Sequence, residues 1–306
     1  MDYLEKRDHL LTEQINPNSR NLDQLSPLEL VDLFNREDAQ TLKAIAQARL
    51  KLAQAIEVSA KSLGRGGRLF YIGAGTSGRL GVLDAAECPP TFCTHPDLVQ
   101  GIIAGGAAAL VRSSENLEDR KEDGASAIAQ RQIVDKDVVV GISAGGTTPF
   151  VHGALEAAKK RGATTIAMTC VPAEQVPIIV DIDIRLLTGP EILAGSTRLK
   201  AGTATKMALN ILSTGVMIRL GKVYGNRMVD VSVTNRKLHD RALKMLEDLT
   251  ELNREEAEIL LESSGKRVKL ALLMHWKALD AQQGQQLLDN HQGNLREAIR
   301  VYNQSQ

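Results

Sequence analysis

Aromatic residues are scarce in this 306-residue chain, which contains four phenylalanines, four tyrosines and one tryptophan, together 3% of the sequence. Proteins that bind single-stranded nucleic acid stack its bases on aromatic side chains, so the composition disfavours this class. The charge gives no sign of a polyanionic partner either, because 37 Lys and Arg residues balance 37 Asp and Glu residues. We therefore expect no nucleic acid among the partners of this chain.

Long hydrophobic runs are also missing, since none approaches the ~20 residues of a membrane-spanning helix. The nearest candidate, 207–221, contains Asn210 and Arg219 and is typical of a buried helix. The first residues, MDYLEKRDHLLTEQ, are polar and predict no secretory signal. Three cysteines without a C-x-x-C motif favour reduced thiols, and we expect a cytoplasmic protein with no membrane partner.

The sequence lacks the spacings that common metal and hydrolase sites require. Its six histidines are scattered, and none pairs with a second ligand at the spacing of a zinc site, so we expect no metal. No Gly-x-Ser-x-Gly elbow of a serine hydrolase is present.

The N-terminal part of the chain is predicted to be helical, with two helix starts. Ser26 with Glu29 forms a capping box. Asn35, followed by Asp38, predicts the start of a second helix.

Beyond residue 67 the pattern changes to apolar strands that alternate with helical stretches. Such repeated β-α units predict an α/β fold with a doubly wound, mostly parallel sheet and ligands at the carboxyl ends of its strands. The run 137–143 is continuously apolar, as is typical of a strand covered on both faces. The five expected strands are 68–73, 99–105, 137–143, 164–170 and 181–187.

The last part of the chain returns to short helices, and three capping pairs predict a small helical bundle. The pairs are Asn253 with Glu256, Asp280 with Gln283, and Asn294 with Glu297. We divide the chain into an N-terminal helical segment at 1–58, an α/β domain at 59–222 and a C-terminal helical region at 223–306.

The stretch YIGAGTSGRLG contains a glycine motif, G-x-G-x-x-G, between an expected strand and an expected helix. A dinucleotide site would need an acid at the end of the second strand, but that strand ends in Ala-Gly-Gly without a carboxylate. Gly75 and Gly78 instead flank Thr76 and Ser77, whose hydroxyls suit a terminal phosphate. The alternative is that both hydroxyls only cap the helix.

Two later loops show similar chemistry at the ends of other strands. Thr147 and Thr148 follow a glycine turn, and Ser196 and Thr197 precede Lys200 at the start of a long helix. Each loop could be an ordinary helix cap. Together they predict one hydroxyl-rich pocket that fits a phosphosugar better than a cofactor.

Two carboxylates are candidates for acid and base chemistry. Glu87 lies in the apolar stretch LGVLDAAECPP, where burial would raise its pKa, and the prolines predict a sharp helix end directly after it. A solvated surface position is the alternative for Glu87. In SSENLEDRKEDG, Glu115, Glu118 and Asp119 are expected in the first turns of a helix, where acids stabilise the helix dipole without any chemistry.

With these residues, the chain resembles the N-acetylmuramic acid 6-phosphate etherases of the sugar isomerase (SIS) superfamily. The resemblance runs nearly end to end and is most specific in GAGTSGRLGVLDAAECPPT and STRLKAGTATK, which these etherases share with the glucokinase regulatory proteins. It implies that residues 59–222 form a sugar-phosphate-binding SIS domain. The end of the C-terminal helical region at 223–306 resembles the ubiquitin-associated-like three-helix module of these etherases.

The resemblance implies cleavage of the D-lactyl ether of N-acetylmuramic acid 6-phosphate by elimination and then hydration. By the family pattern, Glu87 protonates the leaving group and Glu118, in a motif usually written V-E-G-A-E-D, is the base. No cofactor is implied, because the aldehyde of the open-chain sugar stores the developing charge. His239 is a candidate for opening the sugar ring.

The resemblance further implies a homodimer whose active site is completed by the partner chain. One loop departs from the family: where relatives read Ala-Ser-Gly-Arg-Thr-Pro, this chain reads Ala-Gly-Gly-Thr-Thr-Pro at 144–149. Backbone N–H groups with Thr147 or Thr148 would then have to bind phosphate. A phosphosugar isomerase and a non-catalytic, sugar-phosphate-binding regulator remain the alternative functions.

Overall fold

The computed structural model describes residues 7–112 and 115–304. The chain forms two compact units, one from Met1–Ala86 and Asp97–Ser213 and the other from Glu87–Pro96 and Thr214–Gln306. The divisions expected after residues 58 and 222 remain predictions. No described helix has both the length and the apolar character to span a membrane.

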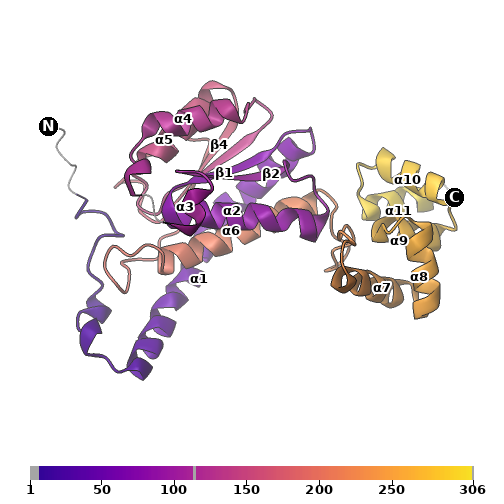
Figure 1. Cartoon of the computed structure of the whole chain (residues 1–306), viewed down its shortest axis with the longest axis horizontal. Helices are drawn as coiled ribbons and strands as arrows, with labels where there is room; N and C mark the ends of the chain where they lie inside the picture. The colour runs from indigo at the N-terminus through magenta and orange to yellow at the C-terminus, as the bar shows by residue number, and fades with distance from the viewer. Residues whose placement is uncertain (1–6, 113–114, 305–306) are drawn as a thin grey trace. The chain divides into compact units, whose positions relative to one another are not determined.

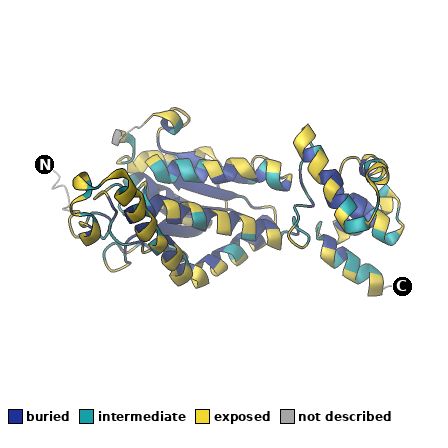
Figure 2. Ribbon diagram, turned by 90° about the horizontal axis from the view of Figure 1, so that it is seen from below, coloured by how far each residue is buried: buried dark blue, intermediate teal, exposed yellow. Residues whose placement is uncertain are grey.

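Five parallel strands form one sheet in the first unit, in the order β2-β1-β3-β4-β5. Every residue of β1 and β3 is buried, as a strand covered on both faces requires (Figure 2). The α/β class and all five expected strands are confirmed. The strands are β1 (Leu69–Gly73), β2 (Val99–Ile103), β3 (Val138–Ile142), β4 (Thr164–Thr169) and β5 (Ile182–Arg185).

Helices cover both faces of this sheet, so the sheet is doubly wound. In Figure 1, α4 and α5 lie on one side of the strands, and α2 and α6 lie on the other. The helices of this part are α1 (Pro27–Leu63), α2 (Gly75–Phe92), α3 (Ala108–Val111), α4 (Lys121–Gln130), α5 (Pro149–Lys160) and α6 (Lys200–Arg219). Three short 3₁₀ turns are η1 (Pro17–Ser19), η2 (Leu22–Gln24) and η3 (Glu115–Leu117).

The predicted second helix start at Asn35 is wrong, because α1 runs without a break from Pro27 to Leu63. Its first cap is as expected, with Ser26 and Glu29 forming the capping box. The buried positions of α1 continue past Asn35 at helical spacing, so packing outweighs the local capping preference of an exposed Asn.

The expected helix end before Pro89 is also wrong. α2 continues through Pro89 and Pro90 to Phe92, and Cys93 then takes a left-handed backbone with its N–H bonded to the Pro89 carbonyl. A proline ring fixes φ near the helical value, so a final turn can form despite the missing N–H donors.

Five helices build the second unit around their own apolar core. Leu246, Leu261 and Leu272 have no exposed surface there. The predicted caps Asn253 and Asp280 both form complete capping boxes. The helices are α7 (Arg236–Thr250), α8 (Arg254–Ser263), α9 (Val268–Lys277), α10 (Ala281–Asn290) and α11 (Leu295–Gln304).

Two glycines allow the close packing of α4 against α5. A Cβ atom on Gly124 would lie 1.9 Å from the carbonyl oxygen of Phe150, and one on Gly153 would lie 2.0 Å from that of Lys121.

We predict that Gly124→Ala forces the helices apart and costs about 1–3 kcal/mol of unfolding free energy, measured by urea denaturation. Ser126→Ala, at an exposed position of α4, is the control; equal stability of both variants would contradict this explanation.

Candidate functional site

The carboxyl ends of the parallel strands bring the predicted loops to one edge of the sheet. Gly73, the last residue of β1, pairs with Ile142 at the end of β3. The loops that follow these two strands therefore begin side by side. One loop leads into α2 and the other leads into α5.

The glycine motif allows α2 to begin directly against β1. A Cβ on Gly78 would lie 2.7 Å from the carbonyl oxygen of Gly73 and 2.6 Å from the side chain of Ile103. Gly75, with φ +51°, has a left-handed backbone that disfavours a side chain. These two glycines are required by backbone geometry, whatever the loop binds.

Five of the six predicted hydroxyl groups have no hydrogen-bond partner among the residues that the structure describes. This holds for Thr76 and Ser77, so neither hydroxyl caps α2. It also holds for Thr147, Ser196 and Thr197, and all five side chains are half-buried. Hydroxyls that face no protein partner are suited to a polar ligand.

The loop between β3 and α5 is held by its own side chains. The hydroxyls of Ser143 and Thr148 lie 2.8 Å apart, so that of Thr148 already has a partner. Nε2 of His152 lies 2.7 Å from the carbonyl oxygen of Gly146 and donates a hydrogen bond to it. The sequence did not single out His152, because its partner lies in a loop six residues earlier.

Glu118 lies beside this second loop. Its carbonyl oxygen accepts a 3.0 Å hydrogen bond from the backbone N–H of Phe150, in the first turn of α5, and its side chain is half-buried. The expected place in the first turn of a helix is wrong, because α4 begins only at Lys121. Stabilisation of a helix dipole therefore does not explain the acid at position 118.

A buried glutamate occupies the N-terminus of α6, next to the third predicted loop, which carries Ser196 and Thr197. The two carboxylate oxygens of Glu191 accept hydrogen bonds of 2.9 Å from the backbone N–H groups of Lys200 and Ala201. Burial raises the pKa of Glu191, and these N–H groups partly offset that effect. The positive end of this helix is thus already neutralised by the protein itself.

Lys200 forms a buried ion pair with Glu37 of α1. Its Nζ lies 2.7 Å from Oε2 of Glu37, and the side chain is 2% exposed. Asn16 and Asn18 donate further hydrogen bonds to Glu37, at 2.6 and 2.8 Å. Burial alone would raise the pKa of Glu37, but the hydrogen bonds from Lys200 and the two asparagines hold it below its ordinary value.

The ion pair with Glu37 bears on the predicted role of Lys200 in phosphate binding. Its ammonium has a protein partner, and its contact with phosphate remains a prediction. Sequence reasoning missed Glu37 and Glu191, which lie 163 and 9 residues from Lys200. For Glu37 the sequence offered one signal, an acid on a stripe of α1 that is otherwise uncharged and includes Leu33 and Ala44.

A close approach of α6 to the glycine loop brings the first and third loops together. A Cβ on Gly202 would lie 3.6 Å from the methyl group of Thr76. This is ordinary van der Waals contact, so the first turn of α6 lies directly beside Thr76. A separate cavity of about 460 Å³ borders Gly105 and Gly106, and none of the predicted site residues lines it.

Glu87 is exposed in the single chain, so the burial expected from its apolar neighbours is wrong. Its neighbours Ala85 and Cys88 are buried, and Glu87 lies on the other side of α2. Glu87 belongs to the second compact unit, whereas Glu118 and the three loops belong to the first. Its place in a common site with Glu118 remains a prediction.

Comparisons with known proteins identify the family. The family model for the glucokinase regulatory protein N-terminal SIS domain matches residues 51–159. The model for the SIS domain matches residues 123–214. The model for the C-terminal lid domain of glucokinase regulatory protein matches residues 225–271. An N-acetylmuramic acid 6-phosphate etherase of Rippkaea orientalis (strain PCC 8801 / RF-1) is 85% identical, over 99% of each chain. This chain belongs to the N-acetylmuramic acid 6-phosphate etherase family. The resemblance seen in the sequence is confirmed.

Other members of the etherase family match over the same span. The protein from Crocosphaera subtropica (strain ATCC 51142 / BH68) is 80% identical, over 98% of this chain and 99% of its own length. The protein from Microcystis aeruginosa (strain NIES-843 / IAM M-2473) is 75% identical, over 99% of each. A solved structure of a phosphoheptose isomerase from Francisella tularensis is 18% identical, with a TM-score of 0.45 over 62% of this chain and 100% of that one.

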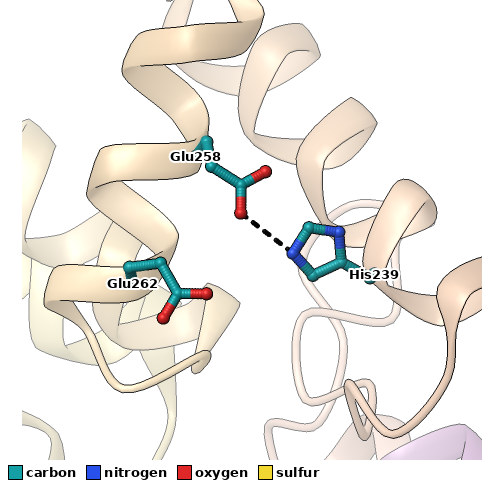
Figure 3. Close-up of side chains that lie close together, drawn as sticks. All are labelled: His239, Glu258 and Glu262. Atoms are coloured by element: carbon teal, nitrogen blue, oxygen red, sulfur yellow. Dashed lines mark ion pairs between the residues drawn. The ribbon is translucent and has the colours of Figure 1, made fainter.

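His239, the candidate for ring opening, lies in a group of three possible metal ligands with Glu258 and Glu262 (Figure 3). One donor atom of each lies within 4.8 Å of the others. The sequence did not show this group because His239 is on α7 and both acids are on α8. Each acid already has a basic partner: His239 lies 3.1 Å from Glu258, and Lys266 lies 3.3 Å from Glu262. We therefore assign no metal here, and the expectation of a metal-free protein remains untested.

The ion pair between Lys200 and Glu37 should contribute to stability in a way that depends on pH. We predict that Lys200→Met, which leaves a buried carboxylate unpaired, lowers the unfolding free energy at pH 7 by about 3–5 kcal/mol in urea. Because the folded pKa of Glu37 is lowered, its contribution is present above the ordinary carboxyl pKa and is lost as the pH falls. The difference between the variant and the original protein should therefore shrink in acid.

The control is Lys206→Met, at an exposed position of α6, with an expected change of at most about 0.5 kcal/mol. Lys200→Met combined with Glu37→Gln should recover part of the loss, because no unpaired charge remains buried. A single variant as stable as the control would remove the pair from any role in stability.

Proposed function

We propose that this chain is an enzyme that cleaves the D-lactyl ether of N-acetylmuramic acid 6-phosphate. The products are N-acetylglucosamine 6-phosphate and D-lactate, which makes the enzyme a carbon–oxygen lyase of amino sugar catabolism and cell-wall recycling. The observation that carries this proposal is the 85% identity, over 99% of both chains, to a named etherase. We place the reaction in the cytoplasm, because all three cysteines are free thiols.

The reaction needs two carboxyl groups and no cofactor. The open-chain aldehyde makes the proton on carbon 2 acidic, and Glu118 removes it. Lactate then leaves carbon 3 while Glu87 protonates the departing oxygen. Water then adds to the resulting alkene: the carboxylate that Glu87 has become takes a proton from water as the hydroxyl bonds to carbon 3, and Glu118 returns its proton to carbon 2, which restores both acids.

The proposed substrate contacts are supported by the geometry of the first unit. Glu118 lies beside the loop that carries Thr147, within the edge where the strands β1 and β3 end. The hydroxyls of Thr76, Ser77, Ser196 and Thr197 have no partner among the described residues. A phosphate group accepts hydrogen bonds through three oxygens, so these hydroxyls and the N–H groups at the start of α2 complement it.

Substitution of Glu118 and substitution of Glu87 should affect proton exchange at carbon 2 differently, although both should slow lactate release. We predict that Glu118→Gln loses exchange of the carbon 2 proton with solvent and lowers lactate release by about 10²–10⁴-fold. Glu87→Gln should lose lactate release by a similar factor but keep the exchange, because proton removal does not need it. Exchange is measured by NMR in heavy water, and lactate is measured with a lactate-specific assay.

Glu122→Gln, an exposed acid of the same segment, serves as the control and should behave like the original protein. In water enriched in oxygen-18, the label must appear on carbon 3 of the sugar. Label in the lactate would contradict elimination, and a ketose product without lactate would identify a phosphosugar isomerase. Binding without turnover would identify a regulator.

We further propose that the enzyme is a homodimer whose active sites are shared between subunits. Four large apolar residues of α1 are exposed. At 100° per residue they lie within an arc of about 100°, opposite the buried face of the helix. An apolar stripe of this kind on a soluble surface marks a contact with another protein surface. The four are Leu28, Val31, Leu42 and Leu50.

Disrupting this stripe should dissociate the dimer. We predict that Leu42→Glu combined with Leu50→Glu sediments as a monomer at micromolar concentration and loses most lactate release. Gln47→Glu, an exposed change outside the stripe, should leave both properties intact. A double variant that stays dimeric would exclude α1 as the interface, and a fully active monomer would exclude a shared site.

A further inference from the structure

The second unit contains a cavity of about 460 Å³ that is lined by none of the residues assigned to the proposed reaction. Its size falls within the range of small-molecule sites, roughly 300–1,000 Å³. The walls come from residues 229–234, the start of α9 and one face of α10. Apolar side chains form much of the lining, among them Val229, Val231, Leu270 and Leu288.

Two ammonium groups in this cavity share one carboxylate. Nζ of Lys269 lies 2.6 Å from Oδ2 of Asp230, and Nζ of Lys222 lies 3.1 Å from the same oxygen. One negative charge cannot neutralise two positive ones. The Lys222–Lys269–Asp230 group therefore keeps an excess positive charge at the cavity wall.

Lys269 is the more constrained of the two lysines. Its side chain is 7% exposed, and its Nζ also donates a 2.7 Å hydrogen bond to the carbonyl oxygen of Gly293. Burial lowers the pKa of Lys269 and Lys222 adds to that effect, while Asp230 opposes it. An anion bound in the cavity would favour the charged form.

A third cation adds to this excess. The guanidinium of Arg267 donates hydrogen bonds to the side-chain oxygen of Gln285 and to the carbonyl oxygen of Ser264, which are both neutral groups. Lys266, also in the lining, pairs with Glu262 and contributes less. Asp289 is the second acid of the lining, and its carboxylate accepts a hydrogen bond from Gln285.

We propose that this cavity binds a small organic anion with an apolar body. Its carboxylate or phosphate group would contact Lys222, Lys269 and Arg267, and its body would contact Val229, Val231 and Leu270. The charge selects anions over neutral molecules of the same shape, and the apolar lining selects against inorganic ions.

Cys93 provides a site-specific reporter, because it lines the cavity and is exposed, whereas Cys88 and Cys170 are buried. The full-length protein is treated with iodoacetamide, and alkylation of Cys93 is followed by mass spectrometry. Hexanoate and hexyl phosphate should each slow this alkylation in a saturable way, and the more effective one identifies the preferred anionic group. Hexan-1-ol, a neutral molecule with the same body, should not slow it.

Lys222→Met tests the charge without breaking the ion pair, since Asp230 keeps Lys269 as its partner. This variant and Arg267→Met should each weaken protection by the anions about tenfold, as expected for loss of a charged hydrogen bond. Lys244→Met, at an exposed position outside the cavity, is the control. The proposal is overturned if no anion protects Cys93, if hexan-1-ol protects equally, or if Lys222→Met binds like the control.

Discussion

The buried ion pair between Glu37 and Lys200 is the constraint on which the arrangement of the candidate site depends. Removing two charges from water costs several kcal/mol for each ion, and close pairing with extra hydrogen bonds must offset this cost. Both conditions hold, because Asn16 and Asn18 donate hydrogen bonds to the carboxylate of Glu37 in addition to its close pairing with Lys200. The pair ties α1 to the first residue of α6, and so to the loop that carries Ser196 and Thr197.

Glu191 adds a second constraint at the same helix end. A helix N-terminus attracts anions, and this one already holds a carboxylate on its first two N–H groups. A phosphate near α6 must therefore rely on hydroxyl groups and not on the helix dipole. The N-terminus of α2 differs, because neither Thr76 nor Ser77 caps it. Of the two helix ends, that of α2 is the better place for the phosphate of the proposed substrate.

The sheet could be predicted from sequence because its strands are continuous apolar runs separated by helical stretches, and that pattern depends only on neighbours along the chain. The errors arise where distant contacts decide. Packing along α1 outweighed the cap at Asn35, and the final turn of α2 formed despite Pro89 and Pro90. The carboxylate that pairs with Lys200 lies 163 residues away along the chain, and the expected contact of Lys200 with phosphate remains a prediction. No local pattern could reveal that pairing.

The exposure of Glu87 bears on how the proposed reaction can work. A carboxyl group that donates a proton near neutral pH needs surroundings that disfavour its charged form. Water surrounds Glu87 in the single chain, so its own neighbours along α2 do not provide that environment. The bound sugar or a second copy of the chain must exclude the water instead. The exposed apolar stripe of α1 makes association with a second copy the simpler source.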